Sequence, residues 1–148
     1  MLSPENFEIV KRHVIAETEH RMTETLETLT EDCVFDDKAF GRVWHGRDGA
    51  AAYYRLWWDA FAIRPETDQR YAPSQDLLVV ETRFTGHHDG PFLGVAPTGR
   101  AVSVPMTIFV SFRDGLLSGE RFYWSLADLM GQIGADLPWD LPWAPLDA

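Results

Sequence analysis

Apolar and polar positions follow two different periods along the chain, a helical one first and a strand-like one later. Between Phe7 and Leu29 the apolar residues recur every three or four positions, after a Ser3-Pro4 pair that is typical of a helix start. This spacing predicts one long amphipathic helix, or two helices with a break near His20-Arg21. A second helix is predicted from Ala50 to Ile63, because the segment carries several aromatic residues and a proline follows it.

Three long strands are predicted in the second half of the chain. They cover about Leu77–His88, Arg100–Phe112 and Leu116–Trp124, and Asp114-Gly115 is a strong hairpin signal between the last two. A short helix follows at Leu126–Ile133. Helices that precede antiparallel strands indicate an α+β fold, in which the helices cover one face of a curved sheet.

The length of 148 residues indicates one domain, which we expect at residues 1–134. Residues 135–148 form a tail rich in proline and tryptophan that repeats the sequence Asp-Leu-Pro-Trp. Because each tryptophan side chain offers roughly 150–250 Å² to bury, we expect the tail to dock on the body or on a partner subunit. The six Trp, nine Phe and four Tyr exceed the needs of a small core, which favours an aromatic-lined cavity or an apolar interface.

Charge and cysteine content exclude several classes of partner. The chain has 13 basic and 23 acidic residues, a net charge of −10, which disfavours nucleic acid and anionic membranes. Cys33 is the single cysteine, so no internal disulfide forms and a reducing compartment is favoured. No apolar run reaches the roughly 18 residues of a membrane span, and the N-terminus has no signal-peptide pattern. We therefore expect a cytoplasmic protein.

The segment between the first two long strands carries regularly spaced Gly, His, Phe and Pro residues. It reads Thr85-Gly-His-His-Asp-Gly-Pro-Phe-Leu-Gly-Val-Ala-Pro-Thr-Gly-Arg100. It resembles the Thr-Gly-x-His-x-Gly-x-Phe-x-Gly-x-x-Pro-Thr-Gly-Arg/Lys segment of SnoaL-like proteins, which include polyketide cyclases and ester cyclases. Residues 28–35 and 120–134 resemble their first helix–strand junction and their terminal strand and helix.

This resemblance covers about residues 5–134. It implies the cone-shaped α+β fold of ketosteroid isomerases, scytalone dehydratase, limonene epoxide hydrolase and nuclear transport factor 2. In that fold a curved antiparallel sheet is covered by N-terminal helices, with an internal pocket between them, and the proteins are often homodimers. One position departs from the pattern, because the cyclases carry an acid/base Asp directly after the Trp of the terminal strand, where this chain has Ser125. A serine needs an activating base to move protons near neutral pH.

Asp37 and His88 are the first two catalytic candidates. The resemblance places the general-base Asp of ketosteroid isomerases at about Asp37, which ends a short predicted strand. His88 is in phase with the apolar residues of its strand, including Phe84, so we expect it to face the cavity, where an imidazole suits proton transfer. The alternatives are a turn aspartate bonded locally and a strand-end histidine bonded to the glycine-rich loop.

His13 is the third catalytic candidate. It shares one helical face with Glu17, His20 and Glu24, at spacings of four, three and four residues. It could face the cavity near the position where the isomerases hold an oxyanion-binding tyrosine. His13, Glu17 and His20 could instead bind a metal, or the four residues could form a solvated polar stripe. We predict no metal and no cofactor.

Six residues are predicted to contact a substrate. By analogy with the family, the strand face that carries Arg121, Tyr123 and Ser125 lines the pocket, which leaves Phe122 and Trp124 on the opposite face, buried in a dimer interface. Tyr123 and Ser125 would bind ligand oxygen atoms. The other four candidates are Trp44 at the pocket mouth, and Phe84, Trp57 and Phe61, for which a core position is the alternative.

The leading hypothesis is a cofactor-free enzyme that acts on a small apolar carbonyl compound by isomerisation, aldol cyclisation or dehydration. Asp37 or His88 would be the base, and His13, Tyr123 or Ser125 would polarise an oxygen. One alternative is a non-catalytic ligand-binding or dimeric accessory protein, which Ser125 favours. A second alternative is an epoxide-hydrolase-type enzyme, which would need an Asp–Arg–Asp set around a water.

Overall fold

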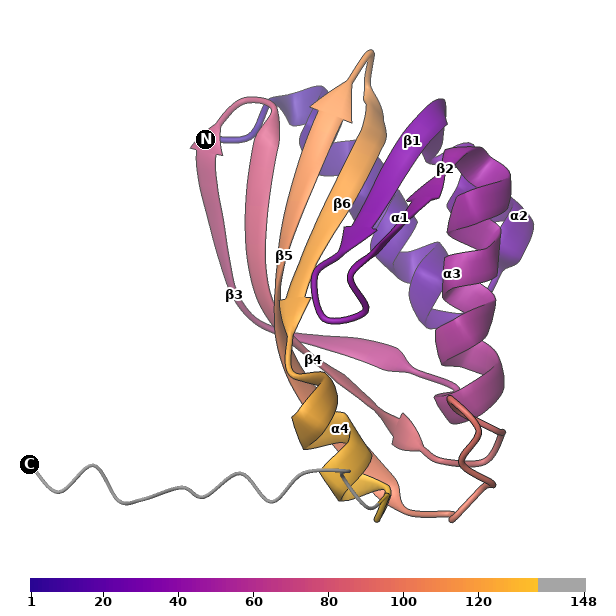
Figure 1. Cartoon of the computed structure of the whole chain (residues 1–148). Helices are drawn as coiled ribbons and strands as arrows, with labels where there is room; N and C mark the ends of the chain where they lie inside the picture. The colour runs from indigo at the N-terminus through magenta and orange to yellow at the C-terminus, as the bar shows by residue number, and fades with distance from the viewer. Residues whose placement is uncertain (136–148) are drawn as a thin grey trace, which may run out of the picture.

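The computed structural model describes residues 1–135, so the prediction that the tail docks lies outside the described residues (Figure 1). The described part of the chain begins with two helices, and a short helix follows its last strand. The helices are α1 (Pro4–Thr18), α2 (Met22–Glu27), α3 (Gly46–Phe61) and α4 (Leu126–Gln132). The strands are β1 (Leu29–Asp37), β2 (Arg42–His45), β3 (Arg64–Ser74), β4 (Leu77–His87), β5 (Ala101–Arg113) and β6 (Leu116–Trp124).

The six strands form one curved sheet in the order β2-β1-β6-β5-β4-β3. All neighbours are antiparallel except β1 and β6, which run in the same direction, with Phe35 opposite Glu120. The predicted α+β class and curved sheet are confirmed, but the sheet is mixed rather than fully antiparallel. The sequence pattern identifies strands without identifying their partners, and here the first strand lies beside the last.

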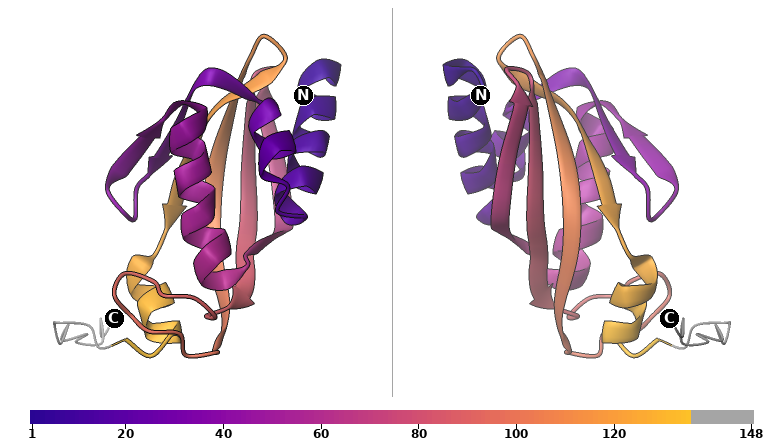
Figure 2. Two further views of the ribbon diagram at one scale, coloured as in Figure 1. Left: turned by 90° about the vertical axis from the view of Figure 1, so that its right-hand side faces the viewer. Right: turned by 90° about the vertical axis from the view of Figure 1, so that its left-hand side faces the viewer.

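Helices α1, α2 and α3 all lie on the concave face of the sheet (Figure 2). The apolar side of α3 packs against β1, and its Tyr53, Trp57 and Phe61 are buried in the core. The Tyr53 ring meets Phe35 and Phe122 of the sheet at centroid distances of 5.6 and 4.8 Å, and the Trp57 ring meets Phe84 at 5.3 Å. The side chains on the other face of the sheet are covered by none of the described elements.

The glycine-rich segment packs directly on the end of α3. A Cβ atom at Gly86 would lie 2.2 Å from the carbonyl oxygen of Phe61, and one at Gly90 would lie 2.1 Å from that of Asp59. The amides of Asp89 and Gly90 both donate to the carbonyl of Ala60, at 3.0 and 2.9 Å. Glycine at positions 86 and 90 therefore allows the loop to seal the lower end of the core.

Most of the predicted elements are present, with shifted ends. The helical segment before Leu29 is divided, as the second alternative had it, and His20 at the break has φ +54°. Strand β3 was not predicted; it forms the opposite edge of the sheet from β2 and is mostly exposed along its length. An exposed edge strand with two prolines carries no alternation of apolar and polar residues, so its pattern resembles a loop.

Candidate functional site

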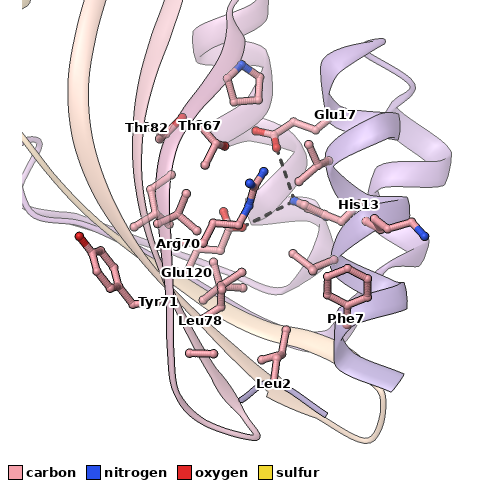
Figure 3. A pocket seen from close by; sticks show the side chains of 18 of the residues that line it. Leu2, Phe7, His13, Glu17, Thr67, Arg70, Tyr71, Leu78, Thr82 and Glu120 are labelled. Atoms are coloured by element: carbon pink, nitrogen blue, oxygen red, sulfur yellow. Dashed lines mark ion pairs between the residues drawn. The ribbon is translucent and has the colours of Figure 1, made fainter. Parts of the chain in front are cut away.

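A pocket of about 790 Å³ lies between α1 and the concave face of β3, β4 and β5 (Figure 3). Helix α1 is fixed at its start, because the Asn6 side-chain amide donates to the Gln75 carbonyl at 2.9 Å and to Asp76 at 3.2 Å. It is fixed again near its end by the buried His13 and Ala16. The walls are mainly apolar and include Leu2, Phe7, Val10, Val14, Leu78, Val80, Phe84, Ile108 and Val110. A cavity of this size and polarity is suited to a small organic ligand.

His13 lies at the buried end of this pocket, and the hydroxyl groups of Thr28 and Tyr54 bond its two ring nitrogens. The Thr28 hydroxyl donates to the carbonyl of Thr25 at 2.6 Å, so its oxygen accepts the proton of His13 Nδ1 at 2.7 Å. His13 Nε2 is then unprotonated and accepts from the Tyr54 hydroxyl at 3.2 Å. Burial lowers the pKa of His13 from 6.5 to about 4, so the ring is neutral at pH 7.

Two carboxyl groups approach the same nitrogen from different elements. Glu17, one turn further along α1, has an oxygen 3.7 Å from His13 Nε2, and Glu120 of β6 has one at 3.6 Å (dashed lines in Figure 3). Their side chains are 14% and 8% exposed. Burial raises the pKa of Glu17 from 4.5 to about 7, and burial together with the charge of Glu17 raises the pKa of Glu120 well above its ordinary value. Both carboxyl groups therefore keep their protons to a higher pH than an exposed glutamate does, and Glu17 titrates near neutral pH.

Of the nine residues predicted to form the site, His13 and Phe84 line this pocket. Asp37 is fully buried but lies outside it, at the end of β1. Its Oδ1 accepts from the amides of Ala39 and Phe40, both at 2.9 Å, and its Oδ2 accepts from Tyr53 at 2.7 Å and Trp124 at 2.8 Å. The structure thus places Asp37 at the start of a turn, bonded to the amides of that turn as in the alternative prediction, and its carboxyl group also accepts from two core side chains.

His88 is also buried outside the pocket, where it continues the inner face of β4. Its Nδ1 accepts from the Thr98 amide at 3.3 Å and lies 3.0 Å from the Thr98 hydroxyl, and its ring packs on Phe61 at 5.3 Å. The strand phase predicted for His88 is correct, because Leu78, Val80 and Phe84 face inward with it. His88 lies at the end of β4 and bonds Thr98 of the glycine-rich loop, as in the alternative prediction for this residue.

The face predicted for β6 is wrong. Tyr123 is 43% exposed and lies on the outer face, where Arg121 stacks on Phe109 at 4.6 Å. Phe122, predicted at a dimer interface, is buried in the core, and Ser125 caps α4 by accepting from the Asp128 amide at 3.1 Å. The reason is that residues 120, 122 and 124 point inward, whereas the analogy assigned the pocket to the alternate set.

Trp44, Trp57 and Phe61 belong to the aromatic core. Trp57 and Phe61 are buried, and Trp44 packs on Tyr53 at a centroid distance of 5.0 Å. None of these three lines the pocket. For Trp57 and Phe61 this is the core position that the sequence allowed.

Two alternative readings of the sequence require groups that do not meet. His20 Nε2 bonds the Ile63 carbonyl at 2.6 Å, and no group of three His, Cys, Asp or Glu residues within 1–135 is placed to hold a metal. An Asp–Arg–Asp set is not formed either, because Arg83 pairs with Asp68 at 2.9 Å and Arg121 lies on the outer face, away from Asp37. Within the same described range, no helix combines the length and apolar character needed to cross a membrane.

Sequence reasoning missed Glu120, the most deeply buried carboxyl of the pocket. β6 has an unpaired extra residue, Ser118, because Ser111 pairs with Gly119 while Phe112 pairs with Leu117. This bulge brings Leu117, Glu120 and Phe122 onto one buried face. The available signal was a single glutamate in phase with Phe122 and Trp124 in a strand, which is unusual for a solvated face.

The comparisons with known proteins agree with this architecture. No curated protein matches the sequence. A protein assigned to the SnoaL-like polyketide cyclases from Jannaschia sp. CCS1 is 26% identical, with a TM-score of 0.79 over 93% of this chain and 99% of that one. TsrD from Streptomyces laurentii is 23% identical, with a TM-score of 0.77 over 92% and 100% of the two chains.

A third structure has a ketosteroid isomerase-like fold and was solved in complex with trimethylamine. It comes from Catenulispora acidiphila and is 20% identical, with a TM-score of 0.73 over 90% of this chain and 97% of that one. The SnoaL-like polyketide cyclase family matches residues 8–133, which include the pocket floor and the glycine-rich loop, and the chain therefore belongs to this family.

Proposed function

We propose that this protein is a cofactor-free enzyme that moves protons on a small apolar carbonyl compound, with Glu17 as the base and Glu120 as a hydrogen-bond donor. One observation carries the proposal. Two desolvated carboxyls from α1 and β6 meet at a neutral histidine, at the buried end of an apolar pocket. Environments that push two neighbouring carboxyls to different pKa values are typical of acid/base pairs.

The chemistry begins with the carbonyl oxygen of the substrate accepting a hydrogen bond from protonated Glu120. Ionised Glu17 then removes a proton from the carbon beside the carbonyl, and the electron pair of the C–H bond moves to form an enolate whose charge rests on that oxygen. Glu17 now holds the proton. In an isomerisation of an unsaturated substrate, Glu17 returns the proton to a different carbon of the conjugated enolate. In an aldol closure, the enolate carbon attacks a second carbonyl of the substrate, and the alkoxide that forms takes the proton from Glu17.

His13 has a positioning role in this scheme. Its ring is fixed by Thr28 and Tyr54, which holds Nε2 3.6 Å from a Glu120 oxygen and 3.7 Å from a Glu17 oxygen. A neutral imidazole brings no positive charge to the site, so it does not favour the ionised form of the carboxyl groups beside it. The ring thereby helps to keep Glu120 in the form that donates.

The test is exchange of α-protons for deuterium in β-tetralone, a simple apolar ketone, followed by proton NMR in heavy water. We expect the wild-type protein to accelerate exchange, with a rate that rises as pH passes about 7, where Glu17 ionises. E17Q should lower the rate about 10²- to 10⁴-fold, the usual contribution of a general base. E8Q, an exposed glutamate on the same helix, is the matched control. A wild-type rate no higher than that of free acetate, or an undiminished E17Q, would contradict the proposal.

We also propose that the protein forms a homodimer through the outer face of its sheet. This face carries Phe109, Arg121 and the 43% exposed Tyr123, stacked on one another without a covering helix. Y123E should shift the protein to monomer in sedimentation equilibrium, whereas L93E, in the exposed loop, should not. An unchanged mass for Y123E would contradict this interface. The cytoplasmic location remains a prediction.

A further inference from the structure

The wall of the pocket that faces α1 carries polar groups that the proton-transfer scheme does not use. Thr67 of β3 and Thr82 of β4 are register partners, and both line the pocket together with Arg70. Thr82 is buried and its hydroxyl oxygen has no hydrogen-bond partner among the described residues. Figure 3 shows Arg70 extending from β3 toward α1, across the pocket.

A bulge in β3 is what directs Arg70 inward. Thr67 pairs with Thr82 and Gln69 pairs with Glu81, so Asp68 is an extra, unpaired residue. Strict alternation after Thr67 would have turned residue 70 to the outer face. The bulge instead places Arg70 opposite Val80, and both side chains line the pocket. Bulges that re-aim one side chain are common beside binding sites.

The charge of Arg70 is not neutralised within the described part of the chain. Arg83, on the outer face, pairs with Asp68 at 2.9 Å and Glu66 at 3.4 Å, whereas residues 1–135 offer Arg70 no ion pair. The other cation that lines the pocket, Lys11, pairs with Glu8 at 3.3 Å. In a chain with a net charge of −10, an inward arginine without an acidic partner indicates that the ligand supplies the negative charge.

We propose that the substrate is an organic anion, with an apolar body and an anionic oxygen group that Arg70 binds at the open side of the pocket. The proposal rests on the proposed function of this pocket. Arg70 is exposed, whereas Glu17 and Glu120 are buried, so the positive charge lies at the opening and the acidic groups lie inside. The anionic group of the substrate is attracted by Arg70 and repelled by the buried carboxyl groups, so the apolar end of the molecule enters the pocket first. The unpartnered hydroxyl of Thr82 is available to a polar atom of the same molecule.

The test compares two fluorescent probes with the same aromatic body. Anilinonaphthalene sulfonate carries an anionic oxygen group, and N-phenylnaphthylamine is its neutral counterpart. We expect the wild-type protein to prefer the sulfonate, and R70Q to weaken sulfonate binding about tenfold or more while changing neutral-probe binding less than twofold. R64Q removes an exposed arginine from the same strand outside the pocket and should leave both affinities unchanged.

V80W, which fills the pocket, should abolish binding of both probes and so locate them. Equal losses of both probes in R70Q, the same loss in R64Q, or sulfonate binding that survives V80W would each overturn the proposal. Binding of either probe does not require proton transfer. If the wild-type protein shows no preference for the sulfonate but accelerates deuterium exchange, only the proposal of an anionic substrate is contradicted. If it prefers the sulfonate but does not accelerate exchange, only the proposed function is contradicted.

Discussion

Asp37 and Glu120 are buried carboxyls on neighbouring strands of the same sheet, and they differ in the donors around them. Asp37 accepts four hydrogen bonds, from the amides of Ala39 and Phe40 and from the side chains of Tyr53 and Trp124. Within residues 1–135 no hydrogen bond reaches Glu120, whose oxygen lies 3.6 Å from Nε2 of the neutral His13 ring. Burial alone therefore does not mark a reactive carboxyl. The number of donors separates a group that holds the fold from one that is available to a ligand.

Removing the Asp37 carboxylate should have the largest effect on stability. D37A leaves two backbone amides, a tyrosine hydroxyl and an indole N–H without their acceptor in the core, which we expect to cost about 3–5 kcal/mol. Urea denaturation measures this loss. D36A, which removes an adjacent, partly exposed aspartate paired with Lys38, should cost less than about 1 kcal/mol. Equal effects of the two substitutions would contradict the structural role of Asp37.

The reactive cluster should reveal itself in the pH dependence of stability. The raised pKa of Glu17 gives stability that is present below pH 4.5 and lost as pH rises to about 7. The lowered pKa of His13 gives stability that is present above pH 6.5 and lost as pH falls to about 4. Each contribution is about 3 kcal/mol, so these two oppose each other with similar size, and the raised pKa of Glu120 adds a further loss of stability as pH rises.

Single substitutions should separate the two opposing contributions. Relative to wild type, E17Q should gain about 3 kcal/mol of stability as pH rises from 4.5 to 7, and H13N should gain about the same as pH falls from 6.5 to 4. Urea denaturation at half-unit steps of pH gives the free energy of unfolding of each protein. The test is how the difference between variant and wild type changes with pH, because a constant offset between them carries no information about titration. Difference curves that stay flat would show that neither group is desolvated.

Two adjacent tyrosines of α3 provide the smallest and most closely matched test. Tyr53 donates to the carboxylate of Asp37, whereas Tyr54 donates to the neutral ring of His13. Bonds to charged groups are the stronger kind, so we expect Y53F to cost about 2 kcal/mol and Y54F about 1 kcal/mol. Both rings stay buried after substitution, and denaturation midpoints give the comparison. A larger loss for Y54F would reverse our assignment of the charged group.

The elements of the fold could be predicted from the sequence more completely than the residues of the site. The long strands, the divided first helix and the helix that ends near Gly134 follow from local periodicity and from glycine or proline at their ends. β3 was missed because its exposed edge position leaves no apolar alternation. The pairing of β1 with β6 depends on contacts about eighty residues apart, which local patterns do not encode.

The site depends on strand faces and on contacts between distant segments, which the local pattern of apolar and polar residues does not specify. His13 and Phe84 were predicted to line the pocket, and both do. Helical spacing indicates which residues share a face with His13, and the alternation of a strand indicates that Phe84 faces inward. Glu120 was missed because the analogy with the family assigned the pocket to the face of Arg121, Tyr123 and Ser125, whereas Glu120 shares the opposite, buried face with Phe122. Asp37 was favoured by its resemblance to a catalytic position, but the four donors that surround it come from the following turn, α3 and β6, and only the folded chain brings them together.

The bulge at Ser118 has a wider consequence for how such proteins diverge. If Ser118 were paired in regular register instead of bulged, the second half of β6 would turn over, so that Arg121 and Tyr123 would enter the interior and Glu120 would leave it. A one-residue slip of register thus exchanges an acidic floor for a basic one while every strand keeps its neighbours. Reaction chemistry in this architecture can therefore change abruptly in evolution, without passing through intermediates that alter the fold.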